Sequence, residues 1–338
     1  MPPKNNKINL RNNLSFLRLT CQSLFAIFCL LVGWQFYSFY LWALDSNTHS
    51  YITRPPAVEA FLPLGALVSI KRFLLGAEFD TIHPAGLTLF IAALLISLFL
   101  RKGFCGWICP IGFASNLAEK FSTKLGILFS LPAWIDIPLL SLKYLLLGFF
   151  SYLILWQMSL EGLTDFHNSA YNLISDAKML HFFLQPSVLA GSIMLGIILF
   201  SFVIRNFWCR YLCPYGGLLG ILAIFSPFQV KRNEETCIDC KKCDRVCPAS
   251  ITITNRKTVR NAECIGCLEC VQVCPAKNCL TLSLPGKKKN TPLLLPILIL
   301  GLFFSCTLIA QVIGHWQSAV PTEDFKRYYK MIDDIGHP

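Results

Sequence analysis

Five long apolar runs constrain the fold of this chain more than any other feature. A bilayer core requires about 20 consecutive apolar residues for each spanning helix. Only 14% of the residues are charged, against about 25% in an ordinary soluble domain. The sequence therefore predicts an all-α polytopic membrane protein with about five transmembrane helices. The expected spans are residues 19–44, 81–100, 137–160, 182–204 and 290–313, and the only Lys, Arg, Asp or Glu within them is Lys143.

Two shorter apolar stretches leave this topology open at two points. Residues 61–70 follow a Pro-Pro pair, and residues 215–225 end at a Ser-Pro pair. Stretches of about 10–14 residues are more often interfacial or re-entrant than spanning. The first long run exceeds the core of a signal peptide and is interpreted as a retained span.

The distribution of Lys and Arg predicts the orientation. Segments 1–18, 101–136 and 205–289 contain 22 basic residues, whereas the alternate segments 45–80, 161–181 and 314–338 contain 7. The positive-inside rule places the first set on the cytoplasmic side of a bacterial inner membrane, so the C-terminal tail is expected in the periplasm. The net charge of +11 follows from this asymmetry, and nucleic acid is not an expected partner.

Two cysteine runs carry the strongest chemical signal. "CIDCKKCDRVCP" starts at Cys237, "CIGCLECVQVCP" starts at Cys264, and both have the spacing of two-cluster bacterial ferredoxins, in which the fourth Cys of each run binds the other cluster. Zinc, which favours two separated pairs, is the less favoured alternative. The predicted ligands are Cys237, Cys240, Cys243 and Cys274 for one [4Fe–4S] cluster, and Cys264, Cys267, Cys270 and Cys247 for the second.

These cysteine runs divide the chain into three expected parts. Residues 1–228 form a membrane domain with four helices, residues 229–286 form an inserted α+β dicluster ferredoxin domain, and residues 287–338 form the last helix and the outer tail. The ferredoxin domain lies in a predicted cytoplasmic segment, where thiols stay reduced.

The membrane domain contains an internal repeat with its own cysteines. "SLFLRKGFCGWICPIG" at 97–112 aligns without a gap to "SFVIRNFWCRYLCPYG" at 201–216, an offset of 104 residues. Spans one and two, and spans three and four, are therefore expected to be two parallel helical hairpins. If each motif is helical, its two cysteines share a face. We expect Cys105, Cys109, Cys209 and Cys213 to surround one iron–sulfur or mononuclear metal centre at the cytoplasmic membrane edge; the alternative is that both pairs only pack.

The remaining cysteines and the histidines give weaker signals. Cys21, Cys29, Cys279 and Cys306 follow no ligand spacing and are interpreted as packing residues. All six histidines fall in or beside predicted outer segments, so no haem is expected in this chain. His83 and His181 each precede a span that leads to a Cys-x3-Cys-Pro motif, with Asp80 and Asp176 nearby. They are the candidate catalytic residues of a quinol site, although ordinary interfacial residues would look the same.

The order of these motifs resembles the NapH, NosR and RdxA/CcoG group of membrane polyferredoxins. The resemblance rests on the two Cys-x3-Cys-Pro motifs, the two ferredoxin runs, "TRPPAVEAFLPLGAL" and the tail "HWQSAVP", and it covers nearly the whole chain. It implies a membrane iron–sulfur protein that takes electrons from quinol, like a quinol dehydrogenase subunit, and passes them to a partner reductase. The segment before the first span is too short for a flavin domain, so no flavin is expected.

Three functions are compatible with these residues. The first is electron relay between the quinone pool and a redox partner protein. The second is reduction of a metal such as cupric ion, as in the RdxA/CcoG group. The third is a non-redox assembly role with structural clusters. A glycine-rich nucleotide fingerprint is absent from the sequence, which disfavours NADH as a direct donor.

Overall fold

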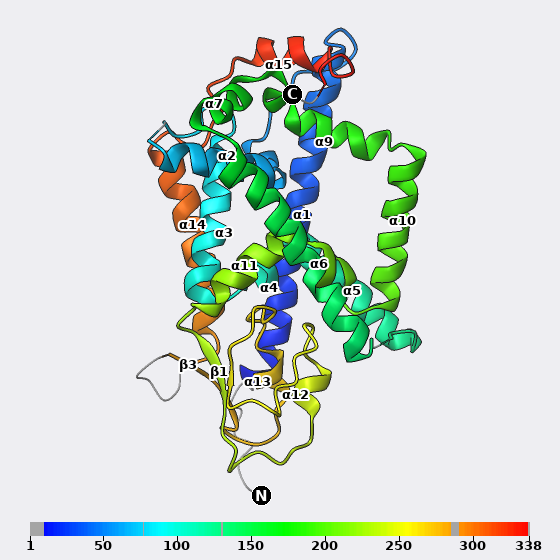
Figure 1. The fold of residues 1–338 in the computed structure, drawn as a ribbon, viewed down its shortest axis with the longest axis vertical. Helices are drawn as coiled ribbons and strands as arrows, with labels where there is room; N and C mark the ends of the chain where they lie inside the picture. Colours follow the sequence, from blue (N-terminus) through cyan, green and yellow to red (C-terminus); the bar gives the residue numbers. More distant parts are fainter. Residues whose placement is uncertain (1–9, 77, 130, 285–290, 337–338) are drawn as a thin grey trace, which may run out of the picture.

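The computed structural model describes residues 10–76, 78–129, 131–284 and 291–336. Helices dominate it, and three of them are long and apolar enough to cross a membrane. They are α1 (Leu10–Leu44), α6 (Ala133–Ser151) continued by the π-helical η2 (Tyr152–Gln157), and α14 (Leu294–Val312). Figure 1 shows the ferredoxin part and the C-terminal helix at opposite ends of the long axis.

Two predicted spans differ from the expected straight helices. The run 182–204 is broken, because α9 (Ser175–Leu184) and α10 (Val188–Val203) meet at an angle of 80°. Pro186 disfavours the α conformation for the residue before it, and the Ser187 side chain then caps α10 by accepting from the Ala190 N–H. The run 81–100 forms α3 (Pro84–Leu100), a helix of 17 residues that begins only at its proline. The described residues thus contain three candidate spans, or four if the bent pair counts as one.

The short apolar stretches form short helices inside the bundle. Residues 61–70 lie in η1 (Pro56–Phe61) and α2 (Pro63–Leu74), and residues 215–225 lie in α11 (Pro214–Ile224). Helix α11 packs on α3, and α5 (Pro110–Leu125) packs on α10. Helix α10 stands apart from the other helices in Figure 1, and none of its residues is buried. Its exposed apolar side chains suit contact with lipid.

Short helices cover the end of the molecule opposite the ferredoxin part. They are α7 (Leu160–Asn168), α8 (Ala170–Leu173), α9 and α15 (Thr322–Tyr329). Helix α15 packs against α1, and its Phe325 and Tyr329 join Phe39 in a buried aromatic cluster. The tail after α14 therefore folds back as part of this layer, which the charge asymmetry predicts to be the outer one. His337 and Asn290 lie outside the described residues.

The ferredoxin part is a small α+β unit below the helices. Its sheet has the order β2-β1-β3, with β1 (Gln229–Arg232) antiparallel to both β2 (Thr258–Val259) and β3 (Leu280–Ser283). In the central register, Val230 faces Val259 on one side and Leu282 on the other. The short helices α12 (Lys242–Arg245) and α13 (Glu269–Val273) each carry part of one cysteine run.

The predicted orientation can be checked by labelling. A thiol introduced by Glu323→Cys, in exposed α15, should react with an impermeant maleimide in spheroplasts. A thiol introduced by Lys257→Cys, on the exposed ferredoxin surface, should react only after the membrane is opened, because the charge asymmetry places that surface inside. The reverse pattern would contradict the predicted orientation.

Candidate iron–sulfur sites and the apolar cavity

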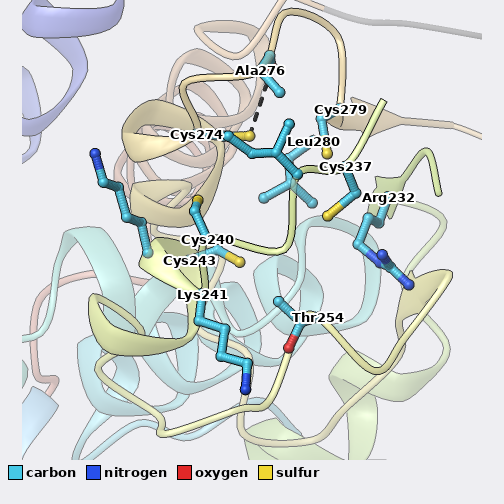
Figure 2. Close-up of a pocket in the computed structure, with 12 residues that line it drawn as sticks. Arg232, Cys237, Cys240, Lys241, Cys243, Thr254, Cys274, Ala276, Cys279 and Leu280 are labelled. Carbon is cyan, nitrogen blue, oxygen red and sulfur yellow. Dashed lines mark hydrogen bonds between the residues drawn. The ribbon is translucent and has the colours of Figure 1, made fainter. Parts of the chain in front are cut away.

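The first predicted ligand set lines one pocket. Cys237, Cys240 and Cys243 come from the first run and Cys274 from the end of the second, and all four border the same space. Figure 2 shows their sulfurs around this pocket, with exposed Lys241 at its rim. The ferredoxin spacing predicts this ligand set, in which three thiols come from one run and the fourth comes from the other.

Cys279 also borders this first pocket, which the sequence did not reveal. It was interpreted as a packing residue, yet its thiol lies beside those of Cys237 and Cys274. The only signal in the sequence is its position five residues after Cys274, which matches no ligand spacing.

The second predicted ligand set is gathered closer to the membrane helices. Burial raises the pKa of Cys270 well above its ordinary value, and the neighbouring thiols of Cys267, Cys264 and Cys247 raise it further. Burial likewise raises the pKa of Cys267 to about 12. Thiolates at such positions need a cationic partner, and an iron–sulfur cluster supplies one.

The chemistry of these all-cysteine ligand sets suits iron–sulfur clusters. Among the residues that the structure describes, no three His, Cys, Asp or Glu side chains converge on one metal position. In a cubane each thiolate binds a different iron, so the ligands surround a larger body. The first set would hold a [4Fe–4S] cluster in its four-thiol pocket, and the second set would hold one with the thiols that gather around Cys270.

The Cys-x3-Cys-Pro motifs are not the continuous helices that the sequence suggested. Cys105 lies in α4 (Gly103–Trp107), while Cys109 is the N-cap of α5, with φ −62° and ψ 122°. Cys209 lies in the π-helical η3 (Trp208–Leu212), and Cys213 is the N-cap of α11. The prolines after the second cysteines begin these helices, a position that suits a residue without an N–H.

A glycine allows the tight turn that the first motif requires. A Cβ on Gly112 would lie 2.6 Å from the Cys105 carbonyl oxygen, closer than non-bonded atoms allow. In the second copy, Gly216 donates its N–H to the Cys213 sulfur at 3.2 Å. The turns bring the two cysteines of each motif together although they belong to different helices.

The four motif thiols gather in one region. Burial raises the pKa of Cys105 well above its ordinary value, and Cys109, Cys213 and Cys209 are near enough to raise it further. Tyr215, which follows the second motif, stacks on Phe90 of α3 with ring centroids 5.7 Å apart. The second motif therefore packs against the helix bundle.

The first motif docks directly on the second ferredoxin run. A Cβ on Gly106 would lie 2.3 Å from the Ile265 carbonyl oxygen, so only glycine allows this approach. The Trp107 indole N–H donates to the Gly266 carbonyl at 3.1 Å. Both carbonyls lie in the loop 264–267, which carries two predicted ligands of the second cluster.

The second motif holds the other end of the same cluster site. Arg205 donates to the Cys247 carbonyl at 3.1 Å, and Asn206 donates to the Pro248 carbonyl at 2.8 Å. Cys247 is the fourth predicted ligand of the second cluster. The two repeat copies thus hold the second cluster site against the motif thiols, and the first cluster site lies farther out.

A buried charge cluster links the helices to this loop. Lys143 is fully buried in α6, and its Nζ lies 2.5 Å from the Glu263 carboxylate. Tyr144 donates to Glu263 at 2.9 Å, and Lys102 lies 3.8 Å from it. Burial would lower the pKa of Lys102, but Glu263 and the motif thiols raise it overall. The charge that interrupts the third apolar run therefore has a partner in the ferredoxin part.

This cluster supports an anionic group at the motif thiols. Two buried ammonium groups, Lys102 and Lys143, share the single carboxylate of Glu263, which leaves an excess positive charge. A buried charge without compensation is costly. Because Lys102 also borders the motif thiols, four thiolates around an iron–sulfur centre would offset the excess.

A large apolar cavity extends from the motif thiols toward the outer layer. Its volume is ≈ 1320 Å³, and its walls come from α1, η1, α3, α6, α10, α11 and α14. Cys109, Cys213 and Tyr215 border it, as do Glu59 and Gly86 near the outer layer. Cys21 and Cys29, interpreted as packing residues, also face it.

The predicted histidine pair is not brought together. His83 is buried, and its Nε2 lies 2.7 Å from the Asn172 carbonyl oxygen. His181 is only partly buried, and its Nδ1 lies 3.8 Å from the exposed Asp333. Neither histidine borders the cavity.

The predicted carboxylate partners also pair differently. Asp176 binds Arg54 and accepts from the Tyr329 hydroxyl, so it is not the partner of His181. Asp80 accepts backbone N–H groups of Ile82 and His83. Asp80 is thus held by backbone N–H groups and Asp176 by Arg54 and Tyr329, so neither forms the expected pair with the ring of His83 or His181.

These features define the class of the protein: helices long enough to cross a membrane carry a docked ferredoxin unit. A family profile described as a 4Fe-4S dicluster domain matches residues 229–275, and one described as a 4Fe-4S binding domain matches residues 82–127 and 186–233. The starts of the two latter matches differ by 104 residues, the offset of the internal repeat.

Similar proteins specify the family. YccM of Escherichia coli K12, named as an electron transport protein, is 38% identical over 310 residues, which are 89% of this chain and 87% of that protein. An uncharacterised protein of Methanocaldococcus jannaschii is 33% identical over 74% of this chain and 80% of its own length. The regulatory protein NosR of Pseudomonas aeruginosa is 34% identical over 47% of this chain and 21% of its own length. No solved structure matches.

The chain belongs to the membrane polyferredoxin family that includes YccM and NosR. This confirms the family that the motifs indicated, together with its iron–sulfur domains. The ligand assignment of each cysteine remains a prediction.

Proposed function

We propose that this protein carries electrons from a quinol in the membrane to a redox partner protein on the inner side. The electrons would pass through a centre held by the four motif thiols, then through the cluster of Cys247, Cys264, Cys267 and Cys270. They would leave through the cluster of Cys237, Cys240, Cys243 and Cys274. Two [4Fe–4S] clusters in the ferredoxin part and a third iron–sulfur centre in the bundle complete the relay.

The apolar cavity is the observation that carries this proposal. Ligand pockets are typically about 300–1,000 Å³ and mainly apolar, so a cavity of ≈ 1320 Å³ is large enough for a quinol ring and part of its tail. The cavity touches Cys109 and Cys213 at one end. The docked loop 264–267 then supplies a continuous protein path toward the ferredoxin part.

The exposure of the two cluster sites supports the order of the relay. The second site is held by Arg205, Asn206 and Trp107 of the repeats, whereas the first has exposed Lys241 and Lys242 at its rim. A partner protein on the cytoplasmic side can closely approach only the first cluster site, which lies farther from the helices. The basic rim favours a partner with an acidic surface.

The proposal can be tested by reduction of the purified protein under anaerobic conditions. Addition of menaquinol should bleach the visible absorption of the oxidised clusters, and the reduced protein should then not be reoxidised quickly by cupric ion. Cluster reduction by dithionite but not by menaquinol would contradict the proposal. Rapid reoxidation by cupric ion, with cuprous ion as product, would instead support the metal reductase alternative.

Iron analysis tests the centre at the motif thiols. The protein should bind about eight irons in the ferredoxin part, together with further iron that is lost in both Cys109→Ala and Cys213→Ala. Cys306→Ala, which changes a cysteine outside the three thiol groups, should leave the iron content unchanged. Equal iron in wild type and both motif variants would show that these cysteines only pack.

A further inference from the structure

We propose that Glu59 takes the proton from the quinol hydroxyl and passes it to Nδ1 of His83. This rests on the proposed function and assigns the proton chemistry of the same cavity. Glu59 lies in η1, within the "TRPPAVEAF" segment, and the sequence alone did not single it out as a functional residue.

Glu59 is a buried carboxylate at the cavity wall. It is 1% exposed, and it borders the apolar cavity together with Gly86. Its Oε1 accepts from Arg54 at 2.8 Å, and its Oε2 accepts from the Gly86 N–H at 3.0 Å. These two partners favour the ionised form. A carboxylate has about four acceptor positions, so lone pairs remain for a quinol hydroxyl, but the Glu59 side chain is fully covered in this structure and a neighbouring side chain must move before the hydroxyl reaches it.

His83 lies behind Glu59 in the tautomer needed to receive a proton. Its Nε2 is 2.7 Å from the Asn172 carbonyl oxygen, which can only accept, so Nε2 carries the hydrogen. In the neutral ring, Nδ1 is then the unprotonated nitrogen. It is buried without a hydrogen-bond partner and lies 3.6 Å from Glu59 Oε1. A small movement of either side chain would bring these atoms within hydrogen-bonding distance.

The surrounding charges allow His83 to hold a proton. Glu59 faces Nδ1, and the Asp80 carboxylate is near enough for His83 to act on it electrostatically. Arg54 opposes protonation, but Asp176 binds it through a second pair at 2.7 Å. The charged and polar groups around the pair are Arg54, Asp80, Asn172, Ser175 and Asp176; Ser69 and His167 contact Asp80, and Tyr329 contacts Asp176.

Oxidation of the quinol requires an acceptor for each proton and each electron. The quinol O–H bond breaks, its proton binds a Glu59 oxygen, and an electron leaves toward the oxidised iron–sulfur centre that Cys109 and Cys213 would hold. The proton then moves from Glu59 to His83 Nδ1, which restores the carboxylate. The second hydroxyl proton binds the restored Glu59 carboxylate and stays there, because His83 already holds the first proton, and the second electron follows the first. One quinol thus gives one quinone, two protons and two electrons.

The test is the rate of cluster bleaching by menaquinol in Glu59→Gln, which keeps the shape of the side chain but cannot accept a proton. Loss of a positioned general base costs about 10²- to 10⁴-fold, so a decrease in that range is expected. Glu59→Asp should recover part of the rate. The matched control is Glu161→Gln, an exposed carboxylate of α7, which should react like wild type.

Two further readouts separate proton transfer from folding. Dithionite should bleach all variants fully, and a quinone analogue should quench tryptophan fluorescence equally in Glu59→Gln and wild type. The infrared C=O stretch of a protonated carboxylic acid should appear when quinol is added to wild type and be missing in Glu59→Gln. A wild-type bleaching rate in Glu59→Gln would overturn the inference. Failure of menaquinol to reduce even the wild type would overturn the proposed function itself.

Discussion

Cys247→Ser should prevent electrons from quinol from reaching the first ferredoxin cluster, which is held by Cys237, Cys240, Cys243 and Cys274. Cys247 comes from the first run but lies with the second ligand set, between the motif thiols and the first pocket. Its loss should remove one [4Fe–4S] cluster, about four irons. The remaining cluster should then be reducible by dithionite, while its reduction by menaquinol falls to background. Iron content, electron paramagnetic resonance and stopped-flow absorption measure these effects.

Cys243→Ser is the matched variant from the same run. It should remove the other cluster, also about four irons, but leave menaquinol able to reduce the cluster that remains. The two variants differ by four positions in the sequence, so a contrast between them tests the crossed ligand pattern. If both variants lost the same paramagnetic signal, or if zinc replaced iron in the wild type, the cluster assignment would be wrong.

Glu263→Gln should destabilise the docking of the ferredoxin part. The change leaves two buried ammonium groups, Lys102 and Lys143, without their shared carboxylate. Breaking a buried pair in this way costs about 3–5 kcal/mol. Thermal unfolding in detergent, followed by thiol labelling and by cluster absorption, should show a large decrease in the midpoint.

An exposed ion pair provides the control for this effect. Glu234 and Lys257 lie 3.1 Å apart with side chains 49% and 79% exposed, and such pairs contribute about 0–1 kcal/mol. Glu234→Gln should therefore change the midpoint little. In Glu263→Gln, addition of Lys143→Met should restore part of the lost stability, because it removes one of the two stranded charges. A midpoint equal to that of Glu234→Gln would contradict the role of the buried cluster.

The class of the protein could be predicted from local sequence alone. Apolar runs of about 20 residues and the doubled Cys-x2-Cys-x2-Cys-x3-Cys-Pro spacing are each specified within a short segment. The comparisons confirm the family and its iron–sulfur domains. The internal repeat, with its offset of 104 residues, could also be found in the sequence, because it requires only that two segments have similar residues.

The break in the run 182–204 marks the limit of reasoning from hydropathy. Mean hydropathy over a window does not reveal the effect of a single proline. Pro186 nevertheless divides that run into α9 and α10, which meet at 80°. The same holds for Cys105 and Cys109, which are four residues apart but lie on different helices. Pro110, which follows Cys109, starts a new helix because a residue without a backbone N–H is tolerated in the first turn.

Tertiary structure alone decided which distant groups meet. Glu263 pairs with Lys143 across 120 residues, and Glu59 approaches His83 across 24. In sequence, Lys143 was visible only as a charge in an apolar run, and Glu59 as one carboxylate near Pro55 and Pro56. The physical reason is that covalent neighbours determine helix formation and ligand spacing, whereas the burial of a charge is tolerable only beside a partner that the folded chain brings to it.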